Sequence, residues 1–598
     1  MTLCLVGISS LCAQTILKGK DFGMYPNRND INAAPLMGQL CDSVRTLSQR
    51  GEHVTIRLER GTYYFYPEDA PMRRYYISNH DQTNPKRVGI ALEGLEGVTL
   101  DGRGAELLFH GQMLPVALVG SKDCTLKNFS IDFATPHITQ LEIMEKNPEG
   151  TKMRVQEGYN WTLEDGVLWT HGEGWKYHAD YAIAFDEETR RLVPQTSDMH
   201  IPTRQLALTA DSLLWAKGWN DARLQEGDLL ALRTWNRPAP GVFLADNVRT
   251  TLRNVKVHYA EGMGLLAQMC EDIEADGFSV CLRGKKDKRY FTTQADATHF
   301  SGCKGTIVER NGLFEGMMDD AINVHGTYLK LVERTDARTI VGQYMHGQSY
   351  GFRWGEVGDT VQFVVSRTME LLGQKHVIHS ITPVDAPINE GVKQFRITFR
   401  EELASEIDPA KADVGVENLT WTPRVVFERN VVRNNRARGS LFSTPRKVVV
   451  RRNLFDHTSG CAILLCGDCN GWYETGACLD VLIEKNTFIN ALTNEFQFTN
   501  AIISIYPEIP DLAGQKKYFH QNIRIQNNRF ETFDRPLLYA KSVDGLSFKD
   551  NSVHFNSDFT PFHWNRHCFL LERVKDFRIS GTKTRGIVED VEQDIMRK

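Results

Sequence analysis

A short apolar unit that ends in asparagine or aspartate recurs along most of the chain, and this repeat restricts the fold more than any other feature. The unit alternates apolar and polar residues before the final residue, as in Val-Val-Phe-Glu-Arg-Asn (425–430). Neighbouring asparagines are 23 residues apart in two places, Asn430 to Asn453 and Asn528 to Asn551, and 33 or 42 apart elsewhere. The alternation predicts strands with one buried face, and asparagine suits the turn that follows each strand.

One copy of this unit cannot bury its own apolar face, so successive copies are expected to stack on one another. A period in the low twenties with three short strands per turn predicts an all-β fold, a right-handed parallel β-helix. A β-sandwich would need paired hairpins, and few Asn-Gly or Asp-Gly hairpin turns separate the copies. The helix-like stretch from Asn32 to Arg50 precedes the first coil, where a helix would cover the exposed edge of that coil.

Two long segments interrupt the repeat, at residues 137–240 and 327–423, and each is too long for a structureless loop. Both alternate apolar and polar residues, so we expect each to form a small inserted β-domain that leaves and rejoins the β-helix. The coils of the β-helix would then occupy residues 14–136, 241–326 and 424–598.

The composition of the chain excludes two classes of protein. The 598 residues are 41% hydrophobic and 24% charged, and the net charge is −5. This balance gives no basic footprint for nucleic acid. No apolar run approaches the ~20 residues that a membrane-spanning helix needs.

The first residues indicate export. Residues 1–14 are small and apolar and end in Leu-Cys-Ala before Gln14, which is typical of the second half of a secretory signal cleaved after Ala13. We therefore expect an exported protein, periplasmic or secreted. The basic beginning of a signal is missing, so residues 1–13 are interpreted as a truncated signal segment, with an ordinary N-terminal strand as the alternative.

Four cysteines cluster late in the chain, at Cys461, Cys466, Cys469 and Cys478. The two-residue gap between Cys466 and Cys469 is that of many zinc sites, but structural zinc sites usually pair two such gaps. A disulfide is the second interpretation. Small buried side chains are the third and the favoured one, because other cysteines of the chain also lie in apolar, strand-like runs.

Three aspartates form the candidate catalytic group. Asp319 and Asp320 are adjacent and follow Asp296 by 23 and 24 residues. Because neighbouring coils of a β-helix lie ~4.8 Å apart, residues one period apart would stack, and the three carboxylates would meet on one wall. The adjacent negative pair would raise the pKa of Asp296, as a general acid requires near neutral pH.

The spacing suits glycoside hydrolysis. Inverting enzymes place their two carboxyl groups ~6.5–9.5 Å apart and retaining enzymes ~5–5.5 Å apart, and stacked or diagonal neighbours on adjacent coils reach both ranges. The doubled aspartate favours inversion, because two carboxylates can hold and deprotonate a water while the third donates a proton. A turn formed by Asp319 and Asp320 beside a surface Asp296 is one alternative, and a calcium site is another.

The segments around these aspartates, Gln-Ala-Asp-Ala-Thr-His-Phe (294–300) and Asn-Gly-Leu-Phe-Glu-Gly-Met-Met-Asp-Asp-Ala-Ile-Asn-Val-His-Gly (311–326), resemble glycoside hydrolase family 110. This family contains exo-acting α-1,3-galactosidases of gut and marine bacteria, some of which remove the blood-group B galactose. The resemblance spans nearly the whole chain. It implies a parallel β-helix with two inserted β-barrel domains, an inverting mechanism, and no metal or other cofactor. It also implies that Asp296 is the general acid and that Asp319 and Asp320 form the base side.

Three polar residues in the same two segments, His299, Asn323 and His325, are the candidates for binding the sugar at its axial hydroxyl. A lone histidine is more often structural, but their position beside the aspartates favours a site. Aromatic side chains on later coils are candidates for stacking on the apolar face of the sugar: Trp472, Tyr473 and Tyr506.

Other functions fit part of the pattern. Polygalacturonases are β-helical hydrolases with a similar aspartate spacing, and the run Gly-Lys-Lys-Asp-Lys-Arg (284–289) could bind their anionic substrate, but their Arg-Ile-Lys motif is missing here. A polysaccharide lyase and a non-catalytic glycan-binding β-helix are further alternatives. The predicted partner is therefore an oligosaccharide or glycoconjugate glycan, branched or linear. A dimer through an aromatic-rich insertion is compatible with the sequence.

Overall fold

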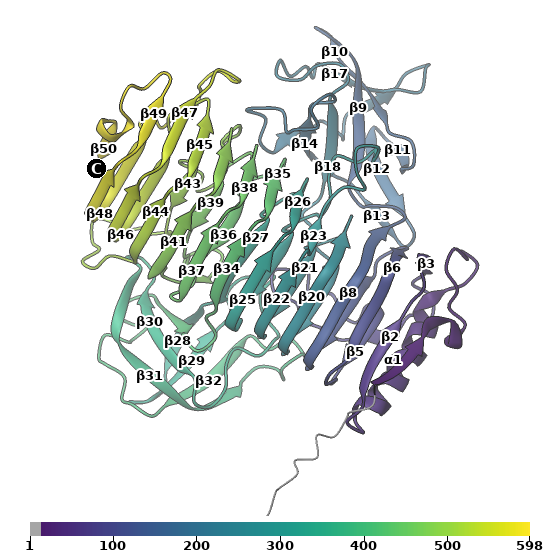
Figure 1. Ribbon diagram of the computed structural model, residues 1–598, viewed down its shortest axis with the longest axis horizontal. Coiled ribbons are helices and arrows are strands. Elements are labelled where there is room, and N and C mark those ends of the chain that lie inside the picture. The colour runs from purple at the N-terminus through teal and green to yellow at the C-terminus, as the bar shows by residue number, and fades with distance from the viewer. Residues whose placement is uncertain (1–13) are drawn as a thin grey trace, which may run out of the picture.

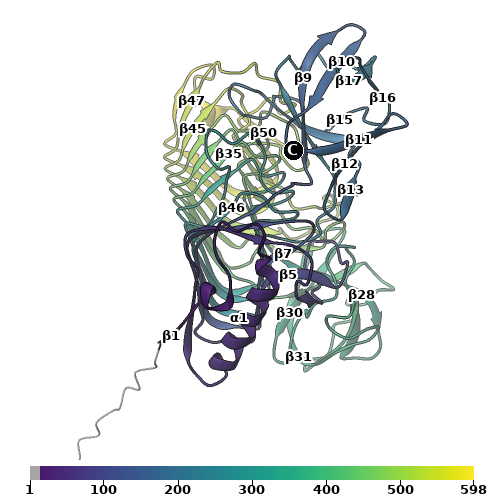
Figure 2. The same ribbon diagram turned by 90° about the vertical axis from the view of Figure 1, so that its right-hand side faces the viewer.

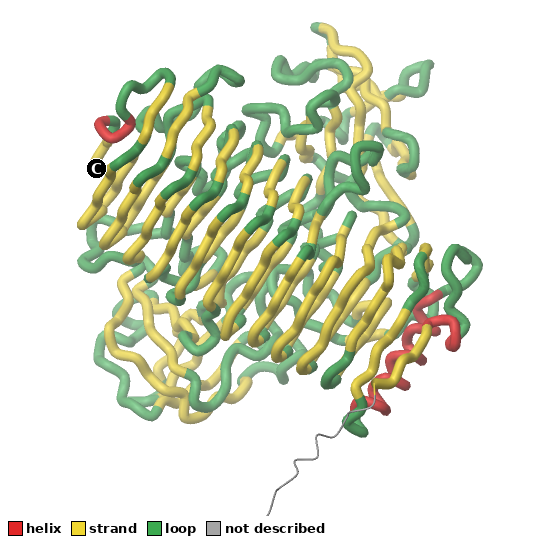
Figure 3. The backbone as a smooth tube through the Cα atoms, viewed as in Figure 1, coloured by secondary structure: helices red, strands yellow, loops and turns green. Residues whose placement is uncertain are grey.

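The computed structural model describes residues 14–598, which form a parallel β-helix with two inserted β-domains (Figure 1). Strands dominate the chain, and the helical turns lie at the two ends of the stack (Figure 3). The predicted fold class is therefore confirmed. The predicted signal segment, residues 1–13, lies outside the described residues. Within residues 14–598, no helix is long and apolar enough to cross a membrane.

Three parallel ladders run along the β-helix. The first contains β1 (Gln14–Lys18), β2 (His53–Arg57), β6 (Thr99–Phe109), β8 (Lys122–Phe133), β20 (Val248–Val257), β22 (Glu271–Asp276), β25 (Lys304–Arg310), β34 (Arg424–Glu428), β37 (Lys447–Arg451), β41 (Asp480–Glu484), β44 (His520–Gln526), β46 (Leu538–Lys549) and β48 (Phe569–Ser580). The second joins β3 (Gly61–Phe65) through β6, β8 and β20 to β23 (Ser279–Val280), β26 (Leu313–Glu315), β35 (Val431–Arg433), β38 (Leu454–Asp456), β42 (Thr487–Ile489), β45 (Arg529–Thr532), β47 (Ser552–Phe555) and β49 (Lys583–Arg585).

The third ladder carries the candidate site. It contains β5 (Lys86–Glu93), β7 (Leu114–Val119), β19 (Val242–Ala245), β21 (Leu265–Gln268), β24 (Thr298–Ser301), β27 (Ile322–Thr327), β36 (Ser440–Phe442), β39 (Ile463–Leu465), β43 (Ile503–Ile505), β46, β48 and β50 (Ile595–Arg597). Two short strands pair antiparallel with it, β4 (Met72–Arg73) with β5 and β40 (Glu474–Thr475) with β27.

A ladder of buried asparagine amides explains the repeat in the C-terminal coils. The backbone N–H of each asparagine donates to the side-chain oxygen of the asparagine on the next coil, at 2.8–3.0 Å: Asn430 to Asn453, Asn453 to Asn486, Asn486 to Asn528, and Asn528 to Asn551. Each of these side chains is almost fully buried. The asparagines therefore satisfy backbone groups inside the β-helix, where an unpaired N–H would be costly.

The turn itself is made by the residue before each asparagine. These residues have φ between 52° and 57°, in the left-handed region: Arg429, Arg452, Lys485, Asn527 and Asp550. The sequence pattern had suggested that the asparagine makes the turn. The structure separates the two tasks, because the buried amide must accept hydrogen bonds while its exposed neighbour absorbs the change in backbone direction.

A single α-helix covers the N-terminal end of the stack, α1 (Ala33–Ser48) (Figure 1). The side chain of Asn32 caps it by accepting the N–H of Ala34 at 3.0 Å. Met37, Leu40 and Val44 are buried against the first coils. The helix thus covers apolar surface that no further coil would bury. Two 3-10 turns complete the helical elements of residues 14–598, η1 (Gly19–Phe22) and η2 (Val591–Gln593).

The first insertion is an open, half-barrel sheet with a small second sheet. Its seven strands, in spatial order, are β15 (Met199–His200), β14 (Tyr181–Phe185), β18 (Leu229–Arg233), β9 (Thr139–Asn147), β10 (Gly150–Val155), β17 (Leu214–Lys217) and β16 (Leu206–Leu208). The second sheet contains β11 (Asn160–Glu164), β12 (Val167–Gly172) and β13 (Trp175–Tyr177).

The second insertion is a closed six-stranded barrel. Its strands, in order around the barrel, are β28 (Leu329–Arg334), β29 (Thr339–Gln343), β32 (Gln394–Phe399), β31 (Glu370–Pro383), β30 (Thr360–Val365) and β33 (Val414–Asn418). Each insertion has its own apolar core. Both lie on the same side of the β-helix in the view along its axis (Figure 2). The loops next to the third ladder are therefore flanked by both insertions.

Candidate active site

A cavity of about 420 Å³ lies beside the third ladder. Its walls are formed by the loops before β24, β27 and β36 and by the loop after β39. The chain leaving the first insertion contributes Trp235 and Arg237, and the second insertion contributes Gln348. The charged lining residues are Arg237, Asp296, Asp319, Arg436, Arg438, Asp468 and Glu474. Segments far apart in the sequence thus enclose one polar site.

The structure brings the three predicted aspartates together, with one oxygen of each within 4.8 Å of the others. Strand register explains this: β24 and β27 pair Thr298 with Ile322, and Asp296 and Asp320 each lie two residues before these partners. The N–H of Asp320 also donates to Oδ1 of Asp296 at 3.2 Å. Asp296 and Asp319 line the cavity, whereas Asp320 is fully buried and does not.

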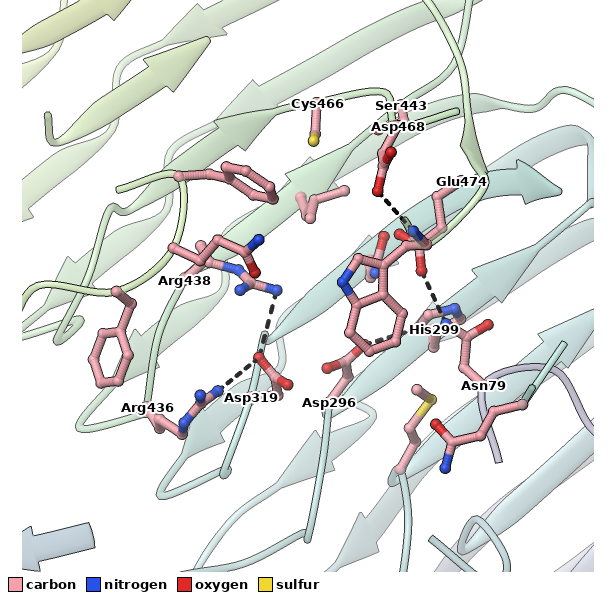
Figure 4. Close-up of a pocket in the computed structure, with 18 of the residues that line it drawn as sticks. Asn79, Asp296, His299, Asp319, Arg436, Arg438, Ser443, Cys466, Asp468 and Glu474 are labelled. Carbon is pink, nitrogen blue, oxygen red and sulfur yellow. Dashed lines mark hydrogen bonds and ion pairs between the residues drawn. The ribbon is translucent and has the colours of Figure 1, made fainter. Parts of the chain in front are cut away.

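Three arginines surround Asp319 at 3.4–3.5 Å: Arg237, Arg436 and Arg438. Figure 4 shows Arg436 and Arg438 beside Asp319, with His299 beyond Asp296 on the other side. Burial alone would raise the pKa of Asp319, but these arginines outweigh it and hold the pKa below its ordinary value. Asp319 is therefore a carboxylate at neutral pH.

Asp296 has the opposite electrostatic environment. Burial, followed by the negative charge of Asp319, raises the pKa of Asp296 to about 7. This carboxyl therefore keeps its proton close to neutral pH while its neighbour is ionised. Two carboxyl groups whose pKa values are driven apart can divide the roles of acid and base.

The two predicted histidines form a hydrogen-bonded chain with Asp296. Nδ1 of His299 lies 2.7 Å from Oδ2 of Asp296, and Nε2 of His299 lies 2.7 Å from Nε2 of His325. Nδ1 of His325 lies 2.7 Å from the carbonyl oxygen of Gly326. His299 lines the cavity, whereas His325 lies behind it and does not. Both ring nitrogens of each histidine thus have protein partners.

Asn323 is the predicted binding residue with a free polar atom. It lines the cavity on β27, and its side-chain oxygen has no hydrogen-bond partner among residues 14–598. A buried amide oxygen without a partner is costly. A sugar hydroxyl in the cavity would satisfy it.

In the described part of the chain, two groups of side chains have the spacing of a cation site: His299, His325 and Glu474, and the three aspartates. The distance of 2.7 Å between the two Nε2 atoms is that of a hydrogen bond, and it leaves no room for an ion between the rings. Around the aspartates, buried guanidinium groups supply the positive charge that a cation would otherwise bring. The chemistry of both groups therefore favours hydrogen bonds and ion pairs over metal binding.

Of the predicted aromatic residues, Trp472 lines the cavity, and Tyr473 and Tyr506 do not. The backbone N–H of Trp472 donates to Asp468 at 2.7 Å, and its ring stacks on His346 of the second insertion at 4.5 Å. The indole is thus fixed at the cavity by groups from two separate domains.

The basic run 284–289 lies outside this cavity. Arg289 is largely buried and binds Asp132 at 2.8 Å. A structural ion pair thus occupies the most buried cation of the run. All ten cysteines among residues 14–598 are buried and free of disulfides. This finding is in line with the third interpretation of the late cysteine cluster.

Sequence reasoning missed the arginines and Glu474. Arg438 lies 118 residues after Asp320, yet it occupies the next coil, because residues 327–423 leave the β-helix between them. β27 and β36 pair Ile322 with Ser440, and Asp320 and Arg438 each lie two residues before these partners. Removing the insertion from the count would have revealed this signal.

Comparisons with known proteins agree with this architecture. Family models described as GLAA-B β-barrel domain I and domain II match residues 139–230 and 339–412. "Alpha-1,3-galactosidase B" of Phocaeicola vulgatus is 56% identical over 96% of this chain and 97% of its own length. The protein of the same name from Bacteroides fragilis is 54% identical over 96% of this chain and 98% of its own. "Alpha-1,3-galactosidase A" of Bacteroides fragilis is 31% identical over 95% and 92%. The chain therefore belongs to this family of α-1,3-galactosidases, which confirms the resemblance to glycoside hydrolase family 110.

Proposed function

We propose that this chain is an exo-acting, inverting α-1,3-galactosidase that removes terminal α-1,3-linked galactose from blood-group B type or linear glycans. The observation that carries the proposal is the contrast between Asp296 and Asp319, which face one cavity with pKa values displaced in opposite directions. The names of the relatives, at 54–56% identity over nearly the whole chain, support the same substrate linkage.

In this mechanism Asp296 is the acid and Asp319 is the base. Asp296 gives its proton to the glycosidic oxygen as the bond from that oxygen to C1 breaks. Asp319 takes a proton from a water whose oxygen forms the new bond to C1. Asp320 does not line the cavity, and its ion pair with Arg438 holds the acidic loop in place.

The cavity supports an exo action. Its volume of about 420 Å³ lies near the lower end of the ~300–1,000 Å³ range for small-ligand pockets. Loops of the β-helix, the end of the first insertion and the second insertion all contribute to its wall. An enclosure of this size suits one terminal sugar better than the middle of a polysaccharide.

Retention of the anomeric configuration is the second candidate mechanism, and one observation favours it. The nearest oxygens of the three aspartates lie within 4.8 Å, close to the ~5–5.5 Å typical of retaining enzymes. Asp319 is ionised within its cluster of arginines, so it can act as a base that deprotonates a water for attack on C1. We therefore favour inversion.

The anomer of the galactose that is released first tests the substrate linkage and the stereochemical outcome in one experiment. A defined α-1,3-galactosyl trisaccharide, with and without a fucose branch, is followed by NMR immediately after enzyme is added. We expect β-galactose first, with and without a chelator. α-Galactose first would establish retention. Galacturonate released from polygalacturonate, or an unsaturated product, would support the rival hydrolase or lyase, and binding without turnover would support a glycan-binding protein.

A further inference from the structure

The hydrogen-bonded chain behind the cavity ends on a group that can only accept. Nδ1 of His325 faces the carbonyl oxygen of Gly326 at 2.7 Å, and a carbonyl oxygen has no proton to give. His325 must therefore carry a proton on Nδ1. This fixed end determines the roles of every atom between Gly326 and Asp296.

With both histidines neutral, only one arrangement satisfies all three contacts. Nε2 of His325 is then an acceptor, so Nε2 of His299 must donate to it. Nδ1 of His299 is consequently an acceptor, and Oδ2 of Asp296 must carry the proton that it accepts. In the second possible arrangement both protons have moved one step toward His325: Nδ1 of His299 donates to an ionised Asp296, and Nε2 of His325, now a cation, donates to Nε2 of His299.

Both arrangements contain two protons between Oδ2 of Asp296 and Nε2 of His325, one in each hydrogen bond, and the loss of the one between Asp296 and His299 is disfavoured. Loss of that proton would set the Nδ1 lone pair of His299 against the carboxylate of Asp296. If His299 changed tautomer instead, two Nε2 lone pairs would face each other at 2.7 Å. Inside a buried cluster, either conflict costs more than it would in water.

We propose that His299 and His325 are positioning residues that hold the proton of the general acid on Asp296, with the carbonyl oxygen of Gly326 fixing their tautomers. This inference rests on the proposed function, because it concerns the acid of that reaction. The proton leaves only when Asp296 transfers it to the glycosidic oxygen. One proton from solvent then restores the chain, and no other bond changes.

The charged surroundings support this role for the histidines. Burial and then His325 lower the pKa of His299 well below its ordinary value, so its ring stays neutral. Glu474 lies 3.4 Å from Nε2 of His325 and accepts a hydrogen bond from Asn79 at 2.9 Å. The Glu474 carboxylate favours the arrangement with the proton on His325. The negative charge of Asp319 favours the arrangement with the proton on Asp296.

The titratable and charged groups that interact with Asp296 and His299 come from several elements of the site: His80, Arg237, Asp319, Asp320, His325, Arg438 and Glu474. The two arginines lower the pKa of Asp296, and burial together with the carboxylates of Asp319 and Glu474 raises it. The histidine chain acts in addition to these charges, since a hydrogen bond that requires the neutral acid stabilises it.

The variant His325→Gln tests the proposal without touching the cavity, because His325 does not line it. The glutamine amide can present either its oxygen or its nitrogen to Nε2 of His299. It therefore no longer forces Nδ1 of His299 to act as an acceptor. With an α-1,3-galactosyl disaccharide we expect kcat at pH 8 to fall about tenfold, because a pKa of the acid that is one unit lower leaves about tenfold less of it protonated at that pH. KM should be nearly unchanged, and the basic limb of the pH profile should move down by about one unit.

α-Galactosyl fluoride separates this role from a structural one, because fluoride leaves without a proton. His325→Gln should hydrolyse it within about threefold of the wild-type rate, since general acid catalysis is not used. The variant His325→Met, which offers no ring nitrogen, should behave in the same way. If one variant does not fold, the other serves for the test.

His520→Gln is the matched control. His520 is also fully buried in the β-helix and accepts the N–H of Cys478 at 2.9 Å, but it lies outside the site. It should leave the pH profile unchanged. Equal losses on both substrates, or a wild-type basic limb in the His325 variants, would overturn the proposal. A wild-type enzyme that releases galactose from neither substrate would instead refute the proposed function.

Discussion

Arg438 donates a hydrogen bond from Nη2 to Oδ2 of Asp320 at 2.9 Å, and its Nε lies 2.9 Å from Oδ1 of the same carboxyl group. The two residues occupy the same register on adjacent coils, so the stacking of the β-helix delivers this two-point contact. Asp320 is fully buried, and Arg438 also reaches Asp319 at 3.5 Å. One guanidinium group thus holds both members of the aspartate pair.

Replacement of this guanidinium should damage both stability and activity. Burial already raises the pKa of Asp320 well above its ordinary value, and Arg438→Met would remove the charge that opposes this rise. The carboxyl group of Asp320 would then be buried without its partner, and removal of one member of a buried pair typically costs about 3–5 kcal/mol. The pKa of Asp319 should rise, because Arg438 is the largest single charge that lowers it. We expect a loss of galactosidase activity of at least about a hundredfold, comparable to removal of a base. Denaturant unfolding and the initial rate at pH 6 measure the two effects.

Arg429→Met is the control for this variant. Arg429 also pairs with a carboxylate, that of Glu428 at 2.9 Å, but its own side chain is 43% exposed. An exposed pair contributes only about 0–1 kcal/mol, so Arg429→Met should stay close to wild type in stability and rate. Similar effects of both substitutions would contradict the special role of Arg438.

The roles of Asp296 and Asp319 can be separated by the leaving group. Asp296→Asn should lose most activity on an α-1,3-galactosyl disaccharide, by about 10²–10⁴-fold, and retain most activity on α-galactosyl fluoride. Asp319→Asn should lose activity on both substrates, because each needs an activated water. Rates for the two variants on the two substrates, with circular dichroism to verify folding, provide the measurement. A disaccharide rate like that of wild type in either variant would refute the assignment.

Asp296 should also make the stability of the enzyme depend on pH. Its pKa is about 7 in the folded protein against 3.8 for an ordinary carboxyl. As pH rises from 4 to 7, the unfolded chain releases this proton while the folded chain keeps it, so the wild type loses stability. The loss is complete above pH 7 and is on the order of 4 kcal/mol.

Asp296→Asn has no such proton, and its amide N–H can still donate to His299. Its Tm should therefore exceed that of the wild type by a margin that grows between pH 4 and 7 and is constant above. Thermal unfolding of both proteins at pH 4.5, 6 and 8 tests this. A margin that shrinks as pH rises would show that Asp296 is ionised in the folded enzyme.

The repeat was sufficient to predict the β-helix because each coil must bury the same apolar face. It also placed Asp296 next to Asp320, since their separation of 24 residues equals one coil. The distance from Asp320 to Arg438 was not readable in this way, because a whole barrel intervenes between the two coils. Periodicity reports contacts between adjacent coils only where no insertion interrupts the count.

Other parts of the site depend on loops that carry no repeat. Trp235 and Gln348 reach the cavity from the two insertions, whose position on the β-helix no local pattern encodes. The sequence also could not show that His325 would lie behind His299 rather than beside the sugar. The alternation of inward and outward residues in β24 and β27 is the same for both histidines. Only the packing of the loops around the cavity decides that His299 lines it and His325 does not.

The asparagine ladder gives the last prediction, because its two possible roles differ in the residue that matters. Asn486 donates from its side-chain nitrogen to the carbonyl oxygen of Val450 at 2.9 Å, and its side-chain oxygen accepts the N–H of Asn453 at 3.0 Å. Asn486→Ala would leave these buried groups unpaired, at about 1–3 kcal/mol for each. We therefore expect a loss of several kcal/mol in the free energy of unfolding.

Lys485 is exposed and makes the turn with φ of 56°. Lys485→Gly should change stability by less than about 1 kcal/mol, since relief of the left-handed strain offsets the added freedom of the unfolded chain. Denaturant unfolding of the two variants decides between the roles: a larger loss for Lys485→Gly would mean that the turn, rather than the buried amide, selects asparagine in every coil.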